Sequence, residues 1–426
     1  MYLLKNGHVV DPVTNTDEIL DVLIDGRIIK KVAKDIAGDT EAAGAEVIEC
    51  TGLTIAPGLM DAHVHFRDPG FTYKEDIESG AKAAARGGVT TVVLMANTKP
   101  AVDNVETLHY IQEKSEKTGI HIIQTVDVTK EIAGKELVDM DELAAEGAAG
   151  FTDDGLPIMD AKLLRDACIK AKELDLPLSL HEEDPAFIEK PGVNMGKVSE
   201  ELNYGGASHL AEDVMVARDA AIALETGAPV VIQHISSGVS VGIVRAFKAM
   251  GADLYAEATP HHFTLTEDAV LKYGTNARMN PPLRTEEDRL AIIEGIKDGT
   301  IDMIVTDHAP HSKEEKQRPM DKAPSGITGI ETSLALGIKS LVQTNEITLM
   351  KLIELMSTNP AKIYRMEPDT VSENAVADLV VFGENENWEV KEEEFASKAS
   401  NSPFIGWELP GKIHYTFCDG KIVYQS

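Results

Sequence analysis

The sequence predicts an α/β protein in which a (β/α)8 TIM barrel carries a small β-sandwich domain built from both chain ends. Three observations predict this fold. Between residues 58 and 365, short apolar runs rich in β-branched residues alternate with longer stretches of helical character. Eight such runs can be counted, and this alternation is typical of βα units that build a parallel barrel. Both chain ends instead carry short strands and turns.

The barrel strands are expected at the eight apolar runs. Between the runs lie segments with apolar residues at spacings of three and four, such as 73–88, 159–174 and 211–227, which indicate helices with one apolar face. In chain order the strands are expected at 58–65, 90–97, 120–126, 149–154, 176–181, 229–234, 253–259 and 302–307.

The two chain ends are expected to form one β-domain. The N-terminal end contains a predicted hairpin around Asp25-Gly26, and the C-terminal end has the same short apolar strands. Two separate β appendages would each leave exposed sheet edges and bury little core. The predicted domains are therefore 1–57 together with 366–426, and the barrel at 58–365.

Composition excludes several classes of function. The chain has 71 acidic and 40 basic residues and a formal charge of −31, which disfavours nucleic acid and anionic membrane surfaces as partners. No apolar run is long enough to span a membrane, and no secretion signal is visible, so a cytoplasmic protein is expected. Cys50, Cys168 and Cys418 lack CxxC spacing, which predicts reduced core residues rather than disulfides or a thiolate zinc site.

Six of the eight predicted strands end in a polar group that could bind a metal ion or a substrate. The carboxyl ends of barrel strands converge at one mouth, so groups far apart in sequence meet there. Histidines at positions i and i+2 of a strand also point to the same face. We therefore expect a metal site, and the strand-end residues are His63 and His65, Asn97, Asp153 and Asp154, His181, His234, and Asp307.

This ligand set contains imidazoles and carboxylates without sulfur, which suits Zn²⁺ in a catalytic site, although Mn²⁺ or Co²⁺ would also suit it. The number of ligands predicts two ions. His63, His65 and Asp307 would hold one ion, and His181 with His234 the other, with a carboxylate between them. A hydroxide shared by both ions would be the nucleophile at neutral pH.

Four strings resemble the long bacterial dihydroorotases of the amidohydrolase superfamily. They are DAHVHFRDPG (61–70), GGVTTVVLMANTKP (87–100), MNPPLR (279–284) and TDHAPH (306–311), and the resemblance covers essentially the whole chain. It implies a barrel of the metal-dependent hydrolase type. It also implies a zinc-dependent cyclic amidohydrolase that interconverts N-carbamoyl-L-aspartate and L-dihydroorotate in pyrimidine biosynthesis.

The resemblance also implies a role for each metal ligand. His63 and His65 would bind the first ion, His181 and His234 the second. Many relatives bridge the ions with a carbamylated lysine, but this chain has Thr152-Asp153-Asp154 at that place. Asp154 is expected to bridge, with Asp153 as the alternative. Asp307 is expected to be the general acid/base.

The substrate is expected to be an anion. Arg67 lies two residues beyond His65, so it should point into the same mouth, and a guanidinium group matches the geometry of a carboxylate. By resemblance, the substrate contacts are His65, Arg67, Asn97, Asn280, Asp307, His311, Ser325 and Gly326. Of these, Arg67, Asn97 and His311 would bind the carboxylate, while Asn280 and the backbone of Ser325-Gly326 would bind the ring amide. Relatives often have Phe-Gly at 325–326, which puts the packing of that loop in doubt.

The remaining conspicuous residues are interpreted as structural. His261 and His262 are expected to support the site from outside or to be structural, and His109, His121 and His209 to lie on the surface or in packing. The polar segment 311–326 is a candidate mobile lid. Two alternative functions stay open: another cyclic amidohydrolase, such as an allantoinase or hydantoinase, or an inactive scaffold for aspartate transcarbamoylase. A homodimer is expected, and association with aspartate transcarbamoylase is a further possibility.

Overall fold

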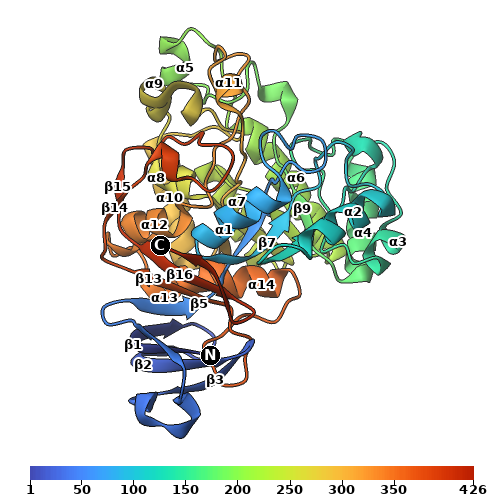
Figure 1. Ribbon diagram of the computed structural model, residues 1–426. Coiled ribbons are helices and arrows are strands. Elements are labelled where there is room, and N and C mark those ends of the chain that lie inside the picture. Colours follow the sequence, from blue (N-terminus) through green and yellow to red (C-terminus); the bar gives the residue numbers. More distant parts are fainter.

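A computed structural model describes residues 1–426 and contains a closed parallel barrel (Figure 1). Hydrogen bonds join β6, β7 and β8 into one part of the barrel and β9, β10, β11 and β12 into another. All of these pairs are parallel. The strands are β6 (Leu59–Val64), β7 (Val89–Leu94), β8 (His121–Gln124), β9 (Leu178–Leu180), β10 (Val230–Ile232), β11 (Leu254–Ala258) and β12 (Met303–Ile304).

The predicted fourth strand, 149–154, is reduced to a short bridge between the two parts. Phe151 pairs in parallel with Val126 on one side and with Leu178 on the other. The chain then turns away from the barrel wall, where Asp153 and Asp154 direct their carboxylates into hydrogen bonds with a loop and a side chain. On the other side, Val64 pairs in parallel with His308, which closes the barrel. The predicted (β/α)8 fold is thereby confirmed.

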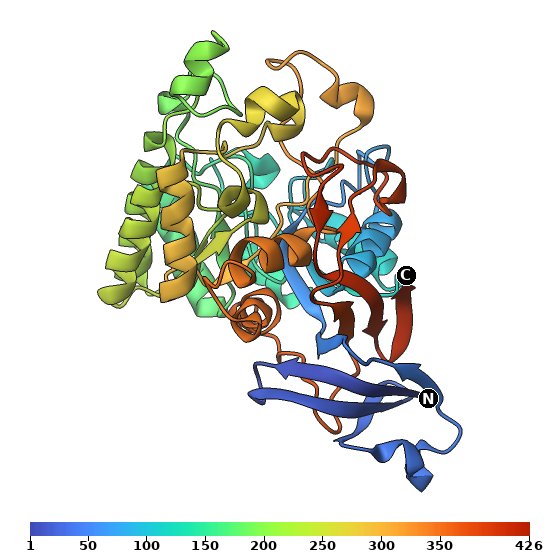
Figure 2. The same ribbon diagram turned by 90° about the vertical axis from the view of Figure 1, so that its left-hand side faces the viewer.

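The helices surround the barrel, and α4, α6, α7 and α10 pack side by side along one flank (Figure 2). Several begin with a side-chain cap, such as Asp76 before α1 and Thr285 before α10. The helices are α1 (Ile77–Arg86), α2 (Val105–Ser115), α3 (Met140–Ala145), α4 (Ala161–Leu174), α5 (Lys197–Glu201), α6 (Leu210–Thr226), α7 (Gly238–Ala249), α8 (Pro260–Thr264), α9 (Ala269–Tyr273), α10 (Glu286–Asp298), α11 (Lys313–Lys316), α12 (Ser333–Gly337), α13 (Leu349–Ile353) and α14 (Asn359–Ile363).

Strands from both chain ends form one eight-stranded sheet beside the barrel, as predicted. Its order is β17-β16-β13-β5-β1-β2-β3, with β4 paired to β1. The antiparallel pair of β5 and β13 joins the N-terminal strands to the C-terminal ones. These strands are β1 (Tyr2–Asp11), β2 (Thr16–Asp25), β3 (Ile28–Ala33), β4 (Glu46–Glu49), β5 (Thr54–Pro57), β13 (Leu379–Gly383), β16 (Lys412–Cys418) and β17 (Lys421–Gln425), while β14 (Trp388–Glu389) and β15 (Glu408–Leu409) pair separately.

This sheet bends over itself and encloses a core. The rings of Tyr2 in β1 and Phe417 in β16 lie 5.5 Å apart, although two strands separate β1 from β16 in the sheet. Leu4, Ile24 and Val381, which come from both chain ends, are fully buried in the same cluster. The sheet therefore behaves as a small sandwich and buries apolar surface that neither chain end could bury alone.

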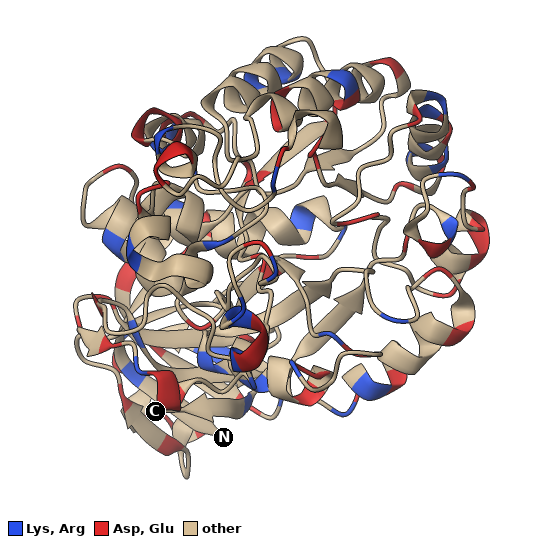
Figure 3. Ribbon diagram, turned by 90° about the horizontal axis from the view of Figure 1, so that it is seen from above, with Lys and Arg blue, Asp and Glu red and all other residues tan.

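Charged residues are interspersed over the outer helices and loops, with acidic and basic groups side by side (Figure 3). None of the helices is long and apolar enough to cross a bilayer.

Candidate active site

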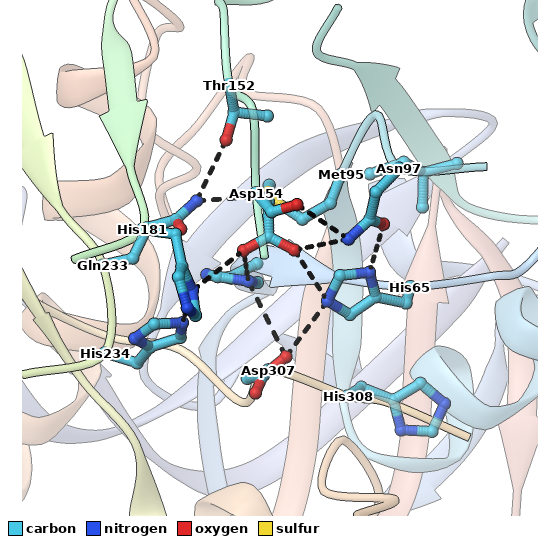
Figure 4. A network of polar contacts seen from close by, with 12 residues as sticks. His65, Met95, Asn97, Thr152, Asp154, His181, Gln233, His234, Asp307 and His308 are labelled. Carbon is cyan, nitrogen blue, oxygen red and sulfur yellow. Dashed lines mark hydrogen bonds and ion pairs between the residues drawn. The ribbon is translucent and has the colours of Figure 1, made fainter. Parts of the chain in front are cut away.

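Two pairs of histidines meet at the carboxyl ends of the barrel strands, with Asp154 between them (Figure 4). In the first pair, the Nε2 atoms of His63 and His65 each lie 3.5 Å from an Asp154 carboxylate oxygen. In the second pair, His181 Nδ1 lies 3.7 Å from Asp154 Oδ1 and 3.1 Å from His234 Nε2. One carboxylate thus faces both pairs at once.

The neighbouring carboxylate of Asp153 points elsewhere. It accepts hydrogen bonds from the backbone N–H groups of Val128 at 2.8 Å and Thr129 at 3.0 Å, and from the Thr129 hydroxyl. These bonds fix the loop after β8. Asp154 is therefore placed where the predicted bridge between two ions would sit, and Asp153 is not.

The site fits metal ions because it contains a buried nitrogen atom without a protein partner. His63 is fully buried, and its Nε2 makes no hydrogen bond. An unsatisfied buried polar atom is costly, and a cation at this point would satisfy it. The donor atoms fall into two groups whose members lie within 4.8 Å of one another: His63, His65 and Asp154, and Asp154, His181 and His234.

The surroundings favour the protonation state that a ligand needs at Asp154 and His234, whereas at His63 and His181 burial would lower the pKa but the carboxylates of Glu257 and Glu183 raise it. Burial alone would raise the pKa of Asp154, but the nearby ring of His63 and the charges of His65 and His181 hold that pKa well below the usual value. Burial and the neighbouring His181 hold the pKa of His234 well below the usual value. Asp154 is therefore an anionic donor and His234 a neutral one, as metal binding requires.

Two glutamates that the sequence interpretation missed orient the histidines. Glu257 Oε2 lies 2.9 Å from His63 Nδ1 and also accepts the backbone N–H of His234 at 3.2 Å. Glu183 Oε2 lies 3.0 Å from His181 Nε2. A carboxylate on the far nitrogen of a ligand histidine fixes its ring and tautomer. Glu257 could have been noticed, because it is an acidic residue within a predicted buried strand.

Asp307 lies next to the first histidine pair, as its place at the end of a predicted barrel strand leads one to expect. Its Oδ1 is 3.1 Å from His65 Nε2 and 3.7 Å from His63 Nε2. Asp307 and His234 both have positive φ, at 47° and 28°. Positive φ is costly for residues with a Cβ and is concentrated at functional sites. The backbone is thus held in a strained conformation that turns both side chains toward the cluster.

A cavity of about 220 Å³ opens onto these residues. The structure brings together at this cavity all the residues predicted to contact the substrate, and it adds Gly155 and Ala309. Its lining includes His65, Arg67, Asn97, Asn280, Asp307, His311, Ser325 and Gly326.

Arg67 is the one lysine or arginine in the cavity lining. Its Nε donates to the Pro310 carbonyl oxygen at 3.4 Å, and its guanidinium group forms no ion pair in the structure. Its backbone φ of 56° turns the residue out of the strand direction. The site therefore offers a half-buried, unpaired guanidinium group beside the histidines and Asp307.

The other predicted substrate contacts are already partly engaged within the protein. Asn97 Oδ1 lies 3.0 Å from His65 Nδ1, and its amide donates to Asp154 Oδ2 at 2.7 Å and to the Asp154 carbonyl oxygen at 3.1 Å. His311 Nε2 lies 2.8 Å from the Ser325 carbonyl oxygen. Asn97 thus positions His65 and Asp154 in this structure, a role that the sequence analysis did not assign to it.

Gly326 closes one side of the cavity and leaves no room for a side chain. Its φ is 113°, and a Cβ atom at this position would lie 2.5 Å from the Cβ of Ala309. Its N–H donates to the Arg278 carbonyl oxygen at 2.9 Å, while its carbonyl oxygen accepts bonds from Lys316 at 3.0 Å and Asn401 at 3.1 Å. Asn280, by contrast, only accepts the Ser325 hydroxyl at 3.0 Å, which leaves its amide nitrogen free.

The histidines interpreted as structural lie outside this cavity. His261 and His262 are buried, and His262 Nε2 lies 3.1 Å from the Pro281 carbonyl oxygen. His109 and His209 pair with acidic residues on nearby helices, at 2.7 Å and 2.6 Å.

Residues 54–423 match the amidohydrolase family. The chain is 59% identical to a dihydroorotase of Clostridioides difficile and 52% identical to one of Clostridium acetobutylicum, in each case over 100% of both chains. It is 50% identical to a dihydroorotase of Lactococcus lactis over 100% of this chain and 99% of the relative.

Solved structures share the fold at low identity. An L-hydantoinase (dihydropyrimidinase) from Arthrobacter aurescens superimposes with a TM-score of 0.87 at 21% identity, covering 100% of this chain and 96% of that one. A dihydropyrimidinase from Brevibacillus agri gives a TM-score of 0.83 at 23% identity, covering 100% of this chain and 95% of that one. The full-length relatives and the family match together show that this chain belongs to the amidohydrolase family, within its dihydroorotase branch.

Proposed function

We propose that this protein catalyses the dihydroorotase reaction, the reversible ring closure of N-carbamoyl-L-aspartate to L-dihydroorotate with release of water, in pyrimidine biosynthesis. One observation carries the proposal: the unpaired guanidinium group of Arg67 lies in the same cavity as Asp307 and the histidine cluster. That arrangement suits an anionic substrate that reacts at an amide. The full-length relatives named dihydroorotase support the choice of substrate.

The donor set supports two divalent cations, with Zn²⁺ as the expected ion and Mn²⁺ or Co²⁺ as alternatives. His63, His65 and Asp307 would hold one ion, His181 and His234 the other, and Asp154 would lie between them. When bound, such ions would lower the pKa of a water molecule to supply the nucleophile and would polarise the reacting carbonyl group.

Asp307 would hold and move the proton. Its carboxylate faces the cavity beside His65, so a proton taken from water on that side can be passed to the departing ring nitrogen during ring opening. In ring closure the same carboxylate would return the proton. The strained backbone at Asp307 fixes the carboxylate for this transfer.

Arg67 would bind the substrate carboxylate through two parallel hydrogen bonds, because its terminal nitrogens have no other partner. The free amide nitrogen of Asn280 would donate to a ring carbonyl oxygen. Asn97 and His311 would bind the carboxylate, and the backbone of Ser325-Gly326 the ring amide, only after giving up present hydrogen bonds.

The proposal is tested with the purified, zinc-loaded protein and a set of alternative substrates. We expect ring closure of carbamoyl aspartate at acidic pH and ring opening of dihydroorotate at alkaline pH. Opening of allantoin or dihydrouracil without turnover of carbamoyl aspartate would assign the chain to another cyclic amidohydrolase. No turnover of any of them after zinc loading would support the inactive scaffold.

We also propose a cytoplasmic homodimer that associates with aspartate transcarbamoylase. Three free, buried cysteines support a reducing compartment. Sedimentation of the protein alone and with aspartate transcarbamoylase measures both associations, and a monomer that does not co-sediment would contradict them.

A further inference from the structure

A second cluster of metal-binding side chains lies at the opposite end of the barrel from the candidate active site. His121 is the first residue of β8, Asp378 immediately precedes β13, and Cys418 is the last residue of β16. One donor atom from each of the three lies within 4.8 Å of the other two. The cluster thus joins a barrel strand to two strands of the β-domain.

The donors are fixed in place. His121 Nε2 lies 2.9 Å from Asp378 Oδ2, and the backbone N–H of Asp419 donates to Asp378 Oδ1 at 2.6 Å. The Asp378 carbonyl oxygen accepts the N–H of Gly58, at the point where β5 leads into the barrel, at 2.8 Å. Asp378 and Cys418 are buried, each with 3% of its surface exposed. Little rearrangement would be needed for the three side chains to share an ion.

The thiol of Cys418 lacks a strong partner of its own. It donates to the Thr90 carbonyl oxygen at 4.0 Å, a distance at which the bond is weak. The two other cysteines are buried in apolar clusters, Cys50 in the β-domain and Cys168 in the barrel. Neither belongs to a group of potential metal ligands. Cys418 is therefore distinguished from them by an imidazole and a carboxylate at ligand distance.

The surroundings are negative. A cavity of about 170 Å³ lies beside His121 and Asp378 and is also lined by Glu367 and Asp369. Arg27 is the one lysine or arginine in that lining, and its guanidinium group is paired with Asp419 at 2.7 Å. His121 is the other side chain of the lining that can carry a positive charge, and it is paired with Asp378 at 2.9 Å. Glu367 and Asp369 form no ion pair, and the cavity leaves space for a water molecule as a further ligand.

We propose that His121, Asp378 and Cys418 form a second metal site, which binds a divalent transition ion such as Zn²⁺ and links the barrel to the β-domain. Thiolate, imidazole and carboxylate are all zinc ligands, and a soft thiolate favours zinc or cobalt over magnesium or calcium. The site is independent of the proposed dihydroorotase activity, because its residues lie at the amino ends of the barrel strands, away from the catalytic cavity.

Cobalt distinguishes the two sites, because the active-site ligands contain no sulfur. The purified full-length protein is stripped with a chelator and reloaded with Co²⁺, and its absorption spectrum and metal content per chain are measured. We expect a near-ultraviolet sulfur-to-cobalt charge-transfer band in the wild type. The Cys418→Ser variant should lose this band and bind one metal ion fewer per chain, while it keeps ring-closure activity when loaded with zinc.

Two matched variants serve as controls. Cys50→Ser and Cys168→Ser also remove a buried free thiol, and both should keep the band. If Cys418→Ser does not fold, His121→Asn removes the imidazole but leaves the thiol, and it should likewise weaken the band and lower the metal content. A wild type without the band, or a band that persists unchanged in Cys418→Ser or in His121→Asn, would overturn the proposal.

Discussion

At the scale of single residues, the candidate site is built from side chains that hold one another. The ring of His63 is fixed by Glu257 on one nitrogen, which leaves the other nitrogen for a cation. Asn97 Oδ1 likewise contacts the Nδ1 atom of His65 and leaves Nε2 for a cation, while the Asn97 amide donates to Asp154. The ligand cluster is therefore arranged before any ion binds, which lowers the cost of binding it.

Replacing Asp307 tests its role in proton transfer. In the Asp307→Asn variant, the amide keeps the shape of the side chain but cannot accept the proton, so turnover should fall by about 10²–10⁴-fold. Zinc content should change little, because four histidines and Asp154 remain. The measurements are the ring-closure rate and zinc per chain, and a turnover close to that of the wild type would remove Asp307 from the mechanism.

Replacing Arg67 tests recognition of the substrate carboxylate. Hydrogen bonds to a charged group contribute about 1.5–3 kcal/mol, so Arg67→Ala should raise KM for carbamoyl aspartate by at least about tenfold. Arg67→Lys keeps the charge but cannot form two parallel hydrogen bonds to a carboxylate, so its KM should lie between those of the wild type and Arg67→Ala. An unchanged KM in steady-state kinetics would show that the carboxylate binds elsewhere.

Replacing Glu257 tests whether orientation of His63 matters for metal binding. Glu257→Gln removes the negative charge on His63 Nδ1, and loss of such a partner costs about 10–100-fold in metal affinity or activity. Competition with a chromogenic chelator measures the affinity. Glu46→Gln, on the exposed surface of β4, is the control and should bind zinc like the wild type. Equal affinities for the two variants would contradict the role of Glu257.

At the scale of elements, sequence periodicity was enough to place seven barrel strands, because each is a short apolar run that alternates with a helical segment. Strand 149–154 was expected to be longer than it is, since the pattern does not reveal that Asp153 and Asp154 leave the barrel wall for opposite partners. Glu183 was missed for a related reason. Its role depends on its side chain turning toward His181, two residues before it, and the sequence pattern does not reveal that direction.

The loop 311–326 is held at its ends. Its helix α11 begins with a capping box between Ser312 and Glu315, and Lys316 donates to the carbonyl oxygens of Pro324 and Gly326 at 3.0 Å. Between these anchors, residues 317–319 and 321–322 are exposed. The lid stays a prediction, and this geometry restricts the expected movement to 317–322.

Asn401 is expected to position this loop. Its Nδ2 donates to the carbonyl oxygens of Ala309 at 3.2 Å and Gly326 at 3.1 Å, and its Oδ1 accepts the N–H of His311 at 3.0 Å. Asn401→Ala leaves these buried groups unpaired, at a cost of about 1–3 kcal/mol for each group. Hydrogen exchange at residues 309–326 should become faster and KM should rise, whereas zinc content should not change.

An exposed asparagine in the same chain is the control. Asn387→Ala removes a hydrogen bond to Glu408 at the surface and should leave exchange and KM as in the wild type. If residues 309–326 exchange their amide hydrogens at the same rate in Asn401→Ala and in the wild type, other contacts hold the loop.

At the scale of the whole molecule, the β-domain ties the two chain ends together. We propose domain boundaries at residues 57/58 and 365/366, because β5 ends at Pro57, β6 begins at Leu59 and α14 ends at Ile363. Composition and strand pattern predicted that both ends share a domain. They could not predict the order of the strands, which depends on β5 inserting between β1 and β13.

Truncating a core residue tests this shared domain. Phe417 is fully buried between strands from both ends, so Phe417→Ala should lower the free energy of unfolding by about 3–5 kcal/mol. Exchange of the β1 and β2 amides should accelerate, although Phe417 lies near the C-terminus. Ile19→Ala, at a position of β2 with 53% exposure, should change stability by less than about 0.5 kcal/mol. A Phe417→Ala protein with unaltered protection of β1 and β2 would argue for two separate β units.

The closing pair of the barrel, Val64 with His308, has a consequence for synthesis of the protein. His65 and Asp307 stand on the two sides of that seam, with His65 Nε2 and Asp307 Oδ1 3.1 Å apart. A nascent chain must therefore emerge from the ribosome beyond residue 308 before its catalytic cluster can assemble. Incomplete translation products that end just before Asp307 contain the four candidate ligand histidines but lack the candidate acid/base residue.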